Sequence, residues 1–209
     1  MKLSVIYYSN NRVAPRLQRF CLEALGSAVS QAGAELVCVT WEPVPAPGAR
    51  QIVWPHRVAN HCNVYQQILA GIALARGQVV SLVEHDVLYP PGYFEAIAEA
   101  GTDGLCYNTN VWRLNRHGFF RADGSHLLSN CGGRCGAVAR AIRSKLAEAR
   151  SGGFPEWAEP EADLEFTAPR PVIDVRHGSN FTGDRRPRNG RYRTRIDYWG
   201  GCERYTKLW

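Results

Sequence analysis

The chain has no hydrophobic run that is long enough to cross a bilayer. Its longest apolar segments, such as Val79–Val83, are much shorter than the roughly 20 residues that a membrane-spanning helix needs. The first residues, Met1–Leu3, lead into a strand-like segment without the apolar stretch and small-residue cleavage site of a secretory signal. We therefore expect a cytoplasmic protein without a transmembrane segment.

The chain also lacks the paired cysteines and histidines of a zinc ribbon. Cys131 and Cys135 lie close together, but no second pair follows at a suitable interval. The seven cysteines are an odd number, and Cys21, Cys38 and Cys106 stand in hydrophobic segments. Reduced thiols in the core explain them most simply.

A P-loop is missing as well. The glycine-rich segment Asn130–Gly136 precedes a predicted helix but has no Gly-Lys-Ser or Gly-Lys-Thr ending. We expect a flexible loop there, which could contact phosphate at the helix start or lie on the acceptor side of a site. An ordinary loop without a ligand is an equal alternative.

The composition fits one globular domain that spans residues 1–209. Hydrophobic residues make up 45% of the chain and aromatic residues 11%, and no internal repeat or domain boundary is visible. The net charge is +6, and six arginines fall between residues 185 and 195, in a basic and aromatic tail that starts at about residue 184. Such a cluster favours an anionic partner, such as a nucleotide diphosphate, nucleic acid or a membrane surface, and a solvated tail is the alternative.

The hydrophobic pattern predicts an α/β fold. Helices are predicted where apolar residues recur at helical spacing, and strands where short apolar runs end in polar residues or glycine. The predicted helices are 15–32, 63–76, 92–100 and 136–149, and the predicted strands are 2–8, 34–40, 51–54, 78–83, 104–107, 111–114 and 171–177. The first strand, helix and strand favour a parallel pair with a right-handed crossover.

The segment 79–94 carries the strongest functional signal. An apolar run delivers Glu84 and Asp86 and stops at a double proline. On an extended segment, side chains two residues apart point to the same side, so these acids would face one space and His85 the other. Mg²⁺ and Mn²⁺ favour one or two carboxylates with open positions for phosphate oxygens. The motif therefore predicts metal-assisted diphosphate chemistry, with capping of the next helix as the alternative.

A second set of polar residues follows the first strand. Ligands of open α/β sheets gather beyond the carboxyl ends of parallel strands, where Tyr8, Ser9 and Asn10 emerge. We expect these residues to contact a nucleotide, although asparagines also form simple turns.

The order of the predicted elements and the motif Glu84-His85-Asp86 resemble the nucleotide-sugar half of the GT-A glycosyltransferases. Those enzymes end the corresponding strand with Asp-x-Asp and a proline-containing turn, and here glutamate replaces the first acid. The resemblance spans residues 3 to about 183. It implies a single-domain, Rossmann-like, mostly parallel sheet flanked by helices. It also implies a divalent metal, Mn²⁺ or Mg²⁺, held by Asp86 with Glu84 and with His177.

The segment Pro160–Leu164 resembles the family's Glu-Asp-x-Asp-Leu element, whose second residue is the base in inverting members. The resemblance implies that Glu161 accepts the proton of the acceptor hydroxyl. Because proline replaces the first acid of the element, Asp163 or Glu159 could take this role instead. The glycine-containing turn after His177 could fold over the diphosphate. The residues expected to contact the nucleotide are Tyr8, Ser9, Asn10, Glu84, His85, Asp86 and Arg185.

Together these features predict a metal-dependent glycosyltransferase that takes its sugar from a nucleoside-diphosphate sugar. Uridine diphosphate is the nucleotide most common in the resembled family. The acceptor is a hydroxyl on a glycan, a lipid, a protein or a modified base in DNA. The arginine-rich, aromatic tail suits nucleic acid, but aromatic rings also stack on sugars. The sequence does not indicate an oligomeric state.

Two other functions compete with this interpretation. A nucleotidyltransferase would bind a nucleoside triphosphate on a similar sheet, but it would normally carry a glycine-rich basic loop where this chain has Tyr8–Arg12. A non-catalytic nucleic-acid-binding protein would use the arginine cluster alone, and its binding would weaken steeply with salt. That function would leave the acidic motif unexplained.

Overall fold

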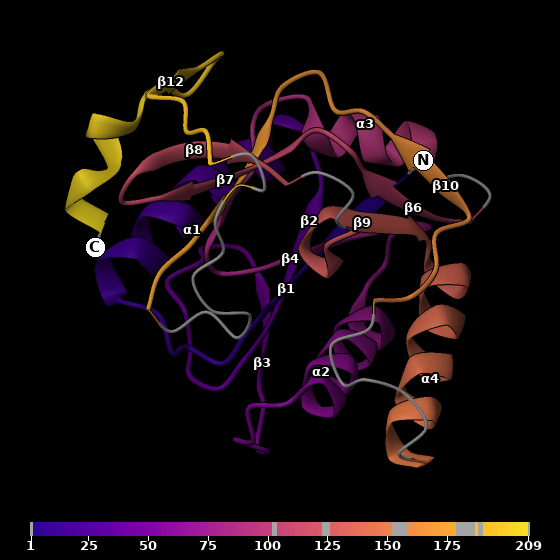
Figure 1. The fold of residues 1–209 in the computed structure, drawn as a ribbon. Helices are drawn as coiled ribbons and strands as arrows, with labels where there is room; N and C mark the ends of the chain where they lie inside the picture. Colours follow the sequence, from indigo (N-terminus) through magenta and orange to yellow (C-terminus); the bar gives the residue numbers. More distant parts are fainter. Residues whose placement is uncertain are drawn as a thin grey trace.

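The computed structural model describes residues 2–101, 104–122, 126–151, 159–178, 187 and 190–208. Within them, a seven-stranded sheet has the order β10-β6-β9-β4-β1-β2-β3 (Figure 1). Its strands are β1 (Leu3–Ser9), β2 (Glu35–Thr40), β3 (Arg50–Val53), β4 (Val79–Val83), β6 (Leu105–Asn108), β9 (Cys131–Arg134) and β10 (Leu164–Phe166). The mixed α/β fold predicted from the sequence is confirmed.

Strand β9 is the antiparallel member of this sheet. It pairs antiparallel with β4 on one side and with β6 on the other, whereas β1, β2, β3 and β4 pair in parallel. The prediction of a flexible glycine-rich loop at 130–136 is wrong, because Gly132 and Gly133 lie in β9 and Gly136 lies in the helix that follows it. A side chain at Gly132 would collide with the carbonyl oxygen of Val80, and one at Gly133 with that of Gly104. The glycines therefore allow close strand approach.

Four helices cover the two faces of the sheet (Figure 1). Alternate residues of β1 show the division, since Tyr7 packs in one core cluster and Tyr8 in the other. Helices α1 (Pro15–Gln31) and α3 (Tyr93–Ala100) contribute to the cluster of Tyr7. Helices α2 (His61–Leu74) and α4 (Cys135–Ser151) contribute to the cluster of Tyr8. Helix α2 starts at a cap, where Asn60 accepts a hydrogen bond from the Asn63 backbone.

A second sheet of four strands has the order β5-β11-β7-β8. Its strands are β5 (Val87–Leu88), β7 (Val111–Asn115), β8 (Gly118–Arg121) and β11 (Val172–Val175). One face, with Leu114, Phe119 and Ile173, forms a third core cluster with α1 and with the C-terminal 3₁₀ helix η2 (Cys202–Leu208). The remaining short elements are η1 (Leu128–Asn130), β12 (Arg195–Ile196) and β13 (Gly200–Gly201).

Two simpler expectations can be compared with the fold. No helix in the described part of the chain has the length and apolar character to span a membrane. Cys21, Cys38 and Cys106 are buried free thiols, as their hydrophobic neighbourhoods predict. Burial raises the pKa of all three, so they are protonated at neutral pH.

Candidate metal and nucleotide site

The acidic motif lies in a turn between the two sheets. Strand β4 ends at Val83, and His85 and Asp86 form a turn before β5 begins at Val87. The alternation of an extended strand therefore does not continue through the motif, and the expectation that His85 faces away from Asp86 is wrong. His85, Asp86 and His177 instead form one group, whose potential ligand atoms all lie within 4.8 Å of one another.

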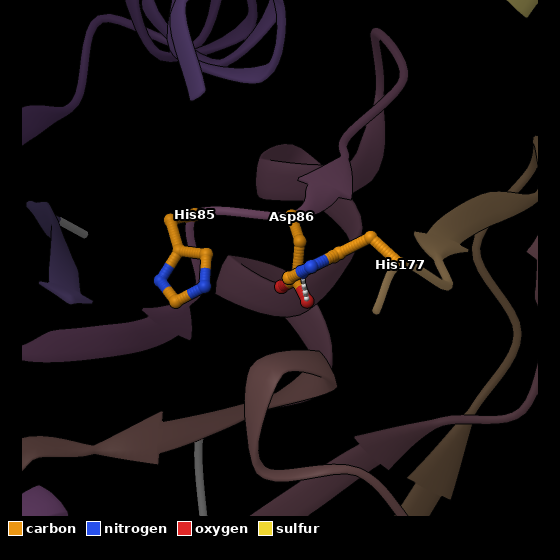
Figure 2. Close-up of side chains that lie close together, drawn as sticks. All are labelled: His85, Asp86 and His177. Carbon is orange, nitrogen blue, oxygen red and sulfur yellow. Dashed lines mark hydrogen bonds and ion pairs between the residues drawn. The ribbon is translucent and has the colours of Figure 1, made fainter. Parts of the chain in front are cut away.

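His177 reaches this group from the second sheet. It follows β11, which pairs antiparallel with β5, and the Val175 backbone N–H donates to the Asp86 carbonyl at 2.8 Å. The Nε2 atom of His177 lies 3.2 Å from Asp86 Oδ2. Figure 2 shows His85 on one side of Asp86 and His177 reaching the carboxylate from the other direction, with a dashed line between His177 and Asp86. Strand pairing therefore brings together residues that are 91 positions apart.

Ser9, at the end of β1, orients His85. Its Oγ lies 2.9 Å from His85 Nδ1, and the same oxygen accepts a hydrogen bond from the Asn11 backbone N–H. With the proton on Nδ1, His85 donates to Ser9 and keeps Nε2 for a cation. A histidine that binds a metal usually has its second ring nitrogen held in this way.

The charges of the group suit a metal ligand set. Burial favours the neutral form of Asp86, but His85 and His177 hold its pKa below the usual range. Burial lowers the pKa of His85 despite the neighbouring Asp86. The site thus combines an ionised carboxylate with a neutral imidazole, which are the protonation states that metal binding requires.

The donor set fits a divalent cation. When two ligand atoms each lie about 2.1 Å from one ion and subtend a right angle at it, they are about 3 Å apart. His177 Nε2 and Asp86 Oδ2 lie at nearly this distance from each other. One carboxylate with imidazoles is a set that first-row transition metals accept more readily than Mg²⁺ does.

Glu84 is adjacent to this group but has another partner. Its Oε1 accepts a hydrogen bond from the Tyr8 hydroxyl at 2.6 Å, and its backbone N–H donates to the Tyr89 hydroxyl at 3.1 Å. Burial and the charge of Asp86 raise the pKa of Glu84 to about 8. The geometry therefore places Glu84 at the wall of the site and not within the group of three potential ligands.

A cavity of about 170 Å³ is lined by His85 and Asp86 of this group, whereas His177 does not belong to its described lining. Its walls come from the ends of β1, β2 and β4, the start of α2, the segment before η1, and β11. The lining includes every strand-end residue expected to contact a nucleotide, namely Tyr8, Ser9, Asn10, Glu84, His85 and Asp86. It also includes Trp41, His61, Asn63, Gln67, Ser129, Glu159, Asp174 and Arg176.

A buried ionic cluster forms one wall of the cavity and was not predicted from the sequence. The Asp174 carboxylate lies 3.3 Å from Arg113 Nε and 3.3 Å from Arg176 Nη1. All three side chains are less than 10% exposed. The sequence holds a weak signal for the cluster, because Asp174 and Arg176 interrupt an apolar strand at alternate positions.

The candidate base residues lie in the segment before β10. Glu161 is exposed and does not belong to the described lining of the cavity. Asp163 Oδ2 accepts a hydrogen bond from the Leu105 backbone N–H at 2.7 Å, so it attaches this segment to β6. Glu159 is the carboxylate of this segment that lines the cavity. Arg185 lies outside the described residues.

Comparisons with known proteins address the fold. No family model and no curated protein matches the sequence. A solved nucleotidyl transferase from Methanothermobacter thermautotroptrophicus superposes with a TM-score of 0.50 and 14% identity, over 81% of this chain and 88% of that one. Residues 1–349 of TarS from S. aureus superpose with a TM-score of 0.51 and 11% identity, over 84% of this chain and 60% of that one. The chain therefore shares a mixed α/β fold with these two proteins.

Proposed function

We propose that this protein is a metal-dependent glycosyltransferase that moves a sugar from a nucleoside-diphosphate sugar, with uridine diphosphate as the nucleotide, to a hydroxyl acceptor. The observation that carries the proposal is the group His85, Asp86 and His177. His85 and Asp86 follow the carboxyl end of β4 and line a cavity that the loop after β1 also lines. Ligands of open α/β sheets bind at this edge.

The cation would neutralise the negative charge that the two phosphates gain as the sugar leaves. We propose Asp86, His85 and His177 as its protein ligands, with Mn²⁺ preferred over Mg²⁺ because imidazole is a poor ligand for Mg²⁺. Glu84 would support the site through its hydrogen bond to Tyr8.

Arg176 supplies a second positive charge on the same side of the cavity. Its guanidinium is fixed by Asp174, and it lies close enough to Asp86 to lower the pKa of that carboxylate. Arginine donates paired hydrogen bonds that match phosphate oxygens. We assign Arg176 to the diphosphate, because it lines the cavity whereas Arg113, on the other side of Asp174, does not belong to the described lining.

The acceptor hydroxyl needs a carboxylate within hydrogen-bond reach to take its proton. We propose that the segment 159–163 supplies it and that the transfer inverts the configuration of the sugar. Glu161 is the residue that the GT-A resemblance implies, and Asp163 is the second candidate. Glu159 is the third, and its position in the cavity wall favours it.

A nucleotidyltransferase is the second candidate, and the shared fold favours it. The two functions leave different products. A glycosyltransferase releases a nucleoside diphosphate, whereas a nucleotidyltransferase releases pyrophosphate from a nucleoside triphosphate. Residues 10–12 after β1 contain no glycine or lysine to hold a triphosphate.

The test is a thermal-shift screen of nucleotide sugars and nucleoside triphosphates, each with and without MnCl₂. A ligand that binds only the folded state raises the melting temperature according to its occupancy. We expect uridine-diphosphate sugars to raise it only with Mn²⁺, and slow release of uridine diphosphate to follow. Stabilisation by triphosphates alone, with release of pyrophosphate, would establish the nucleotidyltransferase instead.

A further inference from the structure

An arginine-rich surface lies at the edge of the second sheet, away from the metal group. Strand β8 pairs there with the chain around Arg193, whose backbone exchanges two 2.8 Å hydrogen bonds with Phe119. The two paired segments, 111–122 and 190–196, contain six arginines and no aspartate or glutamate. We define the arginine surface by the five of these arginines that are exposed, namely Arg116, Arg121, Arg191, Arg193 and Arg195.

Aromatic rings are interleaved with these charges. The guanidinium groups of Arg121 and Arg193 lie 5.6 and 5.1 Å from the ring centroid of Trp112. Tyr192 lies between two arginines in the sequence, and its ring is 5.6 Å from the ring of His117. Beyond β12, Tyr198 is 49% exposed and lies under the guanidinium of Arg170. Trp112 itself is only 8% exposed, whereas His117 and Tyr198 are exposed and Tyr192 is half-buried. The surface therefore offers charges for phosphates and these last three rings for stacking.

Tyr192 and its neighbouring arginines face opposite sides of the second sheet. Arg121 and Arg193 pack over Trp112, on the face that contacts α1, whereas Tyr192 packs on Phe120 on the other face. On β7, Arg113 and Asn115 point to the same face, opposite to the face that packs on α1. Asn115 Nδ2 donates to the Tyr192 hydroxyl at 3.5 Å, and Arg113 contacts Asp174 in the cavity wall. Side chains thus connect Tyr192 to the cavity without leaving one face of the sheet.

From this arrangement we infer that the arginine surface binds a single strand of nucleic acid. Arginines bind the phosphates of a backbone, and aromatic rings stack on unpaired bases whatever their sequence. An anionic membrane surface would be attracted by the same charges, and the vesicle measurement below distinguishes it from nucleic acid. The inference goes beyond the proposed function, and binding at this surface requires neither the metal nor the sugar donor.

Fluorescence anisotropy with a labelled single-stranded oligodeoxyribonucleotide tests the inference, in the absence of metal and donor. The variant replaces Arg191, Arg193 and Arg195 with alanine. The matched control replaces Arg140, Arg143 and Arg150, which are exposed on α4 at the opposite side of the molecule (Figure 1). Each triple variant lowers the net charge from +6 to +3, since three arginines are removed. Thermal unfolding checks that each variant folds.

We expect the wild-type protein to bind the oligonucleotide, with an affinity that falls as salt rises. The surface variant should bind at least about tenfold more weakly, and the slope of log affinity against log salt should fall by about 2, for three lost phosphate contacts. The α4 control should keep the wild-type slope. An oligonucleotide of abasic sites should bind more weakly than the normal one, because stacking is lost.

Three results would overturn the inference. They are no binding at low salt, equal losses in the two triple variants, and tighter binding to anionic vesicles than to the oligonucleotide. If the surface variant does not fold, Arg116→Ala with Arg191→Ala replaces it, because both positions lie outside the strands. That double variant should reduce the salt slope by about 1.4, for two contacts, and an unchanged slope would again contradict the inference.

Discussion

The Tyr8 hydroxyl donates a 2.6 Å hydrogen bond to Glu84 Oε1, and this bond joins the ends of two neighbouring central strands. Burial and the nearby Asp86 raise the pKa of Glu84 from its usual 4.5 to about 8. Between these pH values the folded chain keeps a proton that the unfolded chain has released. The contribution of Glu84 to stability is therefore fully present below pH 4.5 and is lost as the pH rises through 8.

We predict that Glu84→Gln removes this dependence. Both proteins are measured in EDTA. Between pH 5 and 8, the melting temperature of the wild-type protein should fall by several degrees relative to that of the variant. In a chain of this size, 1 kcal/mol of stability corresponds to about 2–4 °C in melting temperature. The comparison cancels the titration of the other groups. A constant difference between the two proteins across this range would show that Glu84 does not hold the proton.

Metal binding should depend on Asp86 far more than on Ser9. Asp86→Asn removes a charged ligand, whereas Ser9→Ala removes only the group that orients His85. Substitutions that orient a ligand typically weaken metal affinity by about 10- to 100-fold. We expect that range for Ser9→Ala and a larger loss for Asp86→Asn, with Mn²⁺ affinity measured by titration calorimetry. Unchanged Mn²⁺ affinity in Asp86→Asn would exclude the proposed site.

The two arginines of the buried cluster should separate structural from binding roles. Arg113→Met and Arg176→Met each remove one partner of Asp174, so both should lower the melting temperature. Only Arg176→Met, and not Arg113→Met, should also weaken the binding of uridine diphosphate. We expect its affinity to fall by about 10- to 100-fold, because hydrogen bonds to a charged group contribute about this much. Calorimetry with uridine diphosphate and Mn²⁺ measures this. Equal losses of affinity in the two variants would assign Arg176 to the fold only.

Single substitutions to glutamine can locate the base. Glu159→Gln and Glu161→Gln keep the size of the side chain and remove its ability to accept a proton at neutral pH. The variant of the true base should lose about 10²- to 10⁴-fold in kcat while KM for the donor stays near the wild-type value. From the cavity wall position we expect this result for Glu159. Normal turnover in both variants would place the base outside these two positions.

Long apolar segments made most of the central sheet predictable. The predicted helix 15–32 is α1 (Pro15–Gln31), and the predicted strand 78–83 contains β4 (Val79–Val83). Sequence patterns failed where an element is short or where tertiary contact decides it. Strand β5 has two residues, too few for a periodic signal. Strand β9 contains two glycines, which local propensity assigns to a loop although close packing between strands requires them.

The sequence pointed to two of the three residues that the structure brings together, Asp86 and His177, but also to Glu84, which has another partner. Asp86 and His177 were expected to lie together, and His177 Nε2 is 3.2 Å from Asp86 Oδ2. The turn at His85 was not predictable, because apolar residues resume directly after it at Val87 and Leu88 and the segment therefore looks like one continuous strand. The cluster around Asp174 depends on the pairing of β7 with β11, which joins segments 61 positions apart. Such long-range register leaves no local pattern in the sequence.

The position of His177 has a mechanical consequence. Asp86 follows strand β4 of the central sheet, and His177 follows strand β11 of the second sheet. An ion bound by both residues would therefore hold the two sheets together. Chelation would then loosen the contact between the second sheet and the central sheet. Metal binding would therefore make the two sheets behave as a single, more rigid unit.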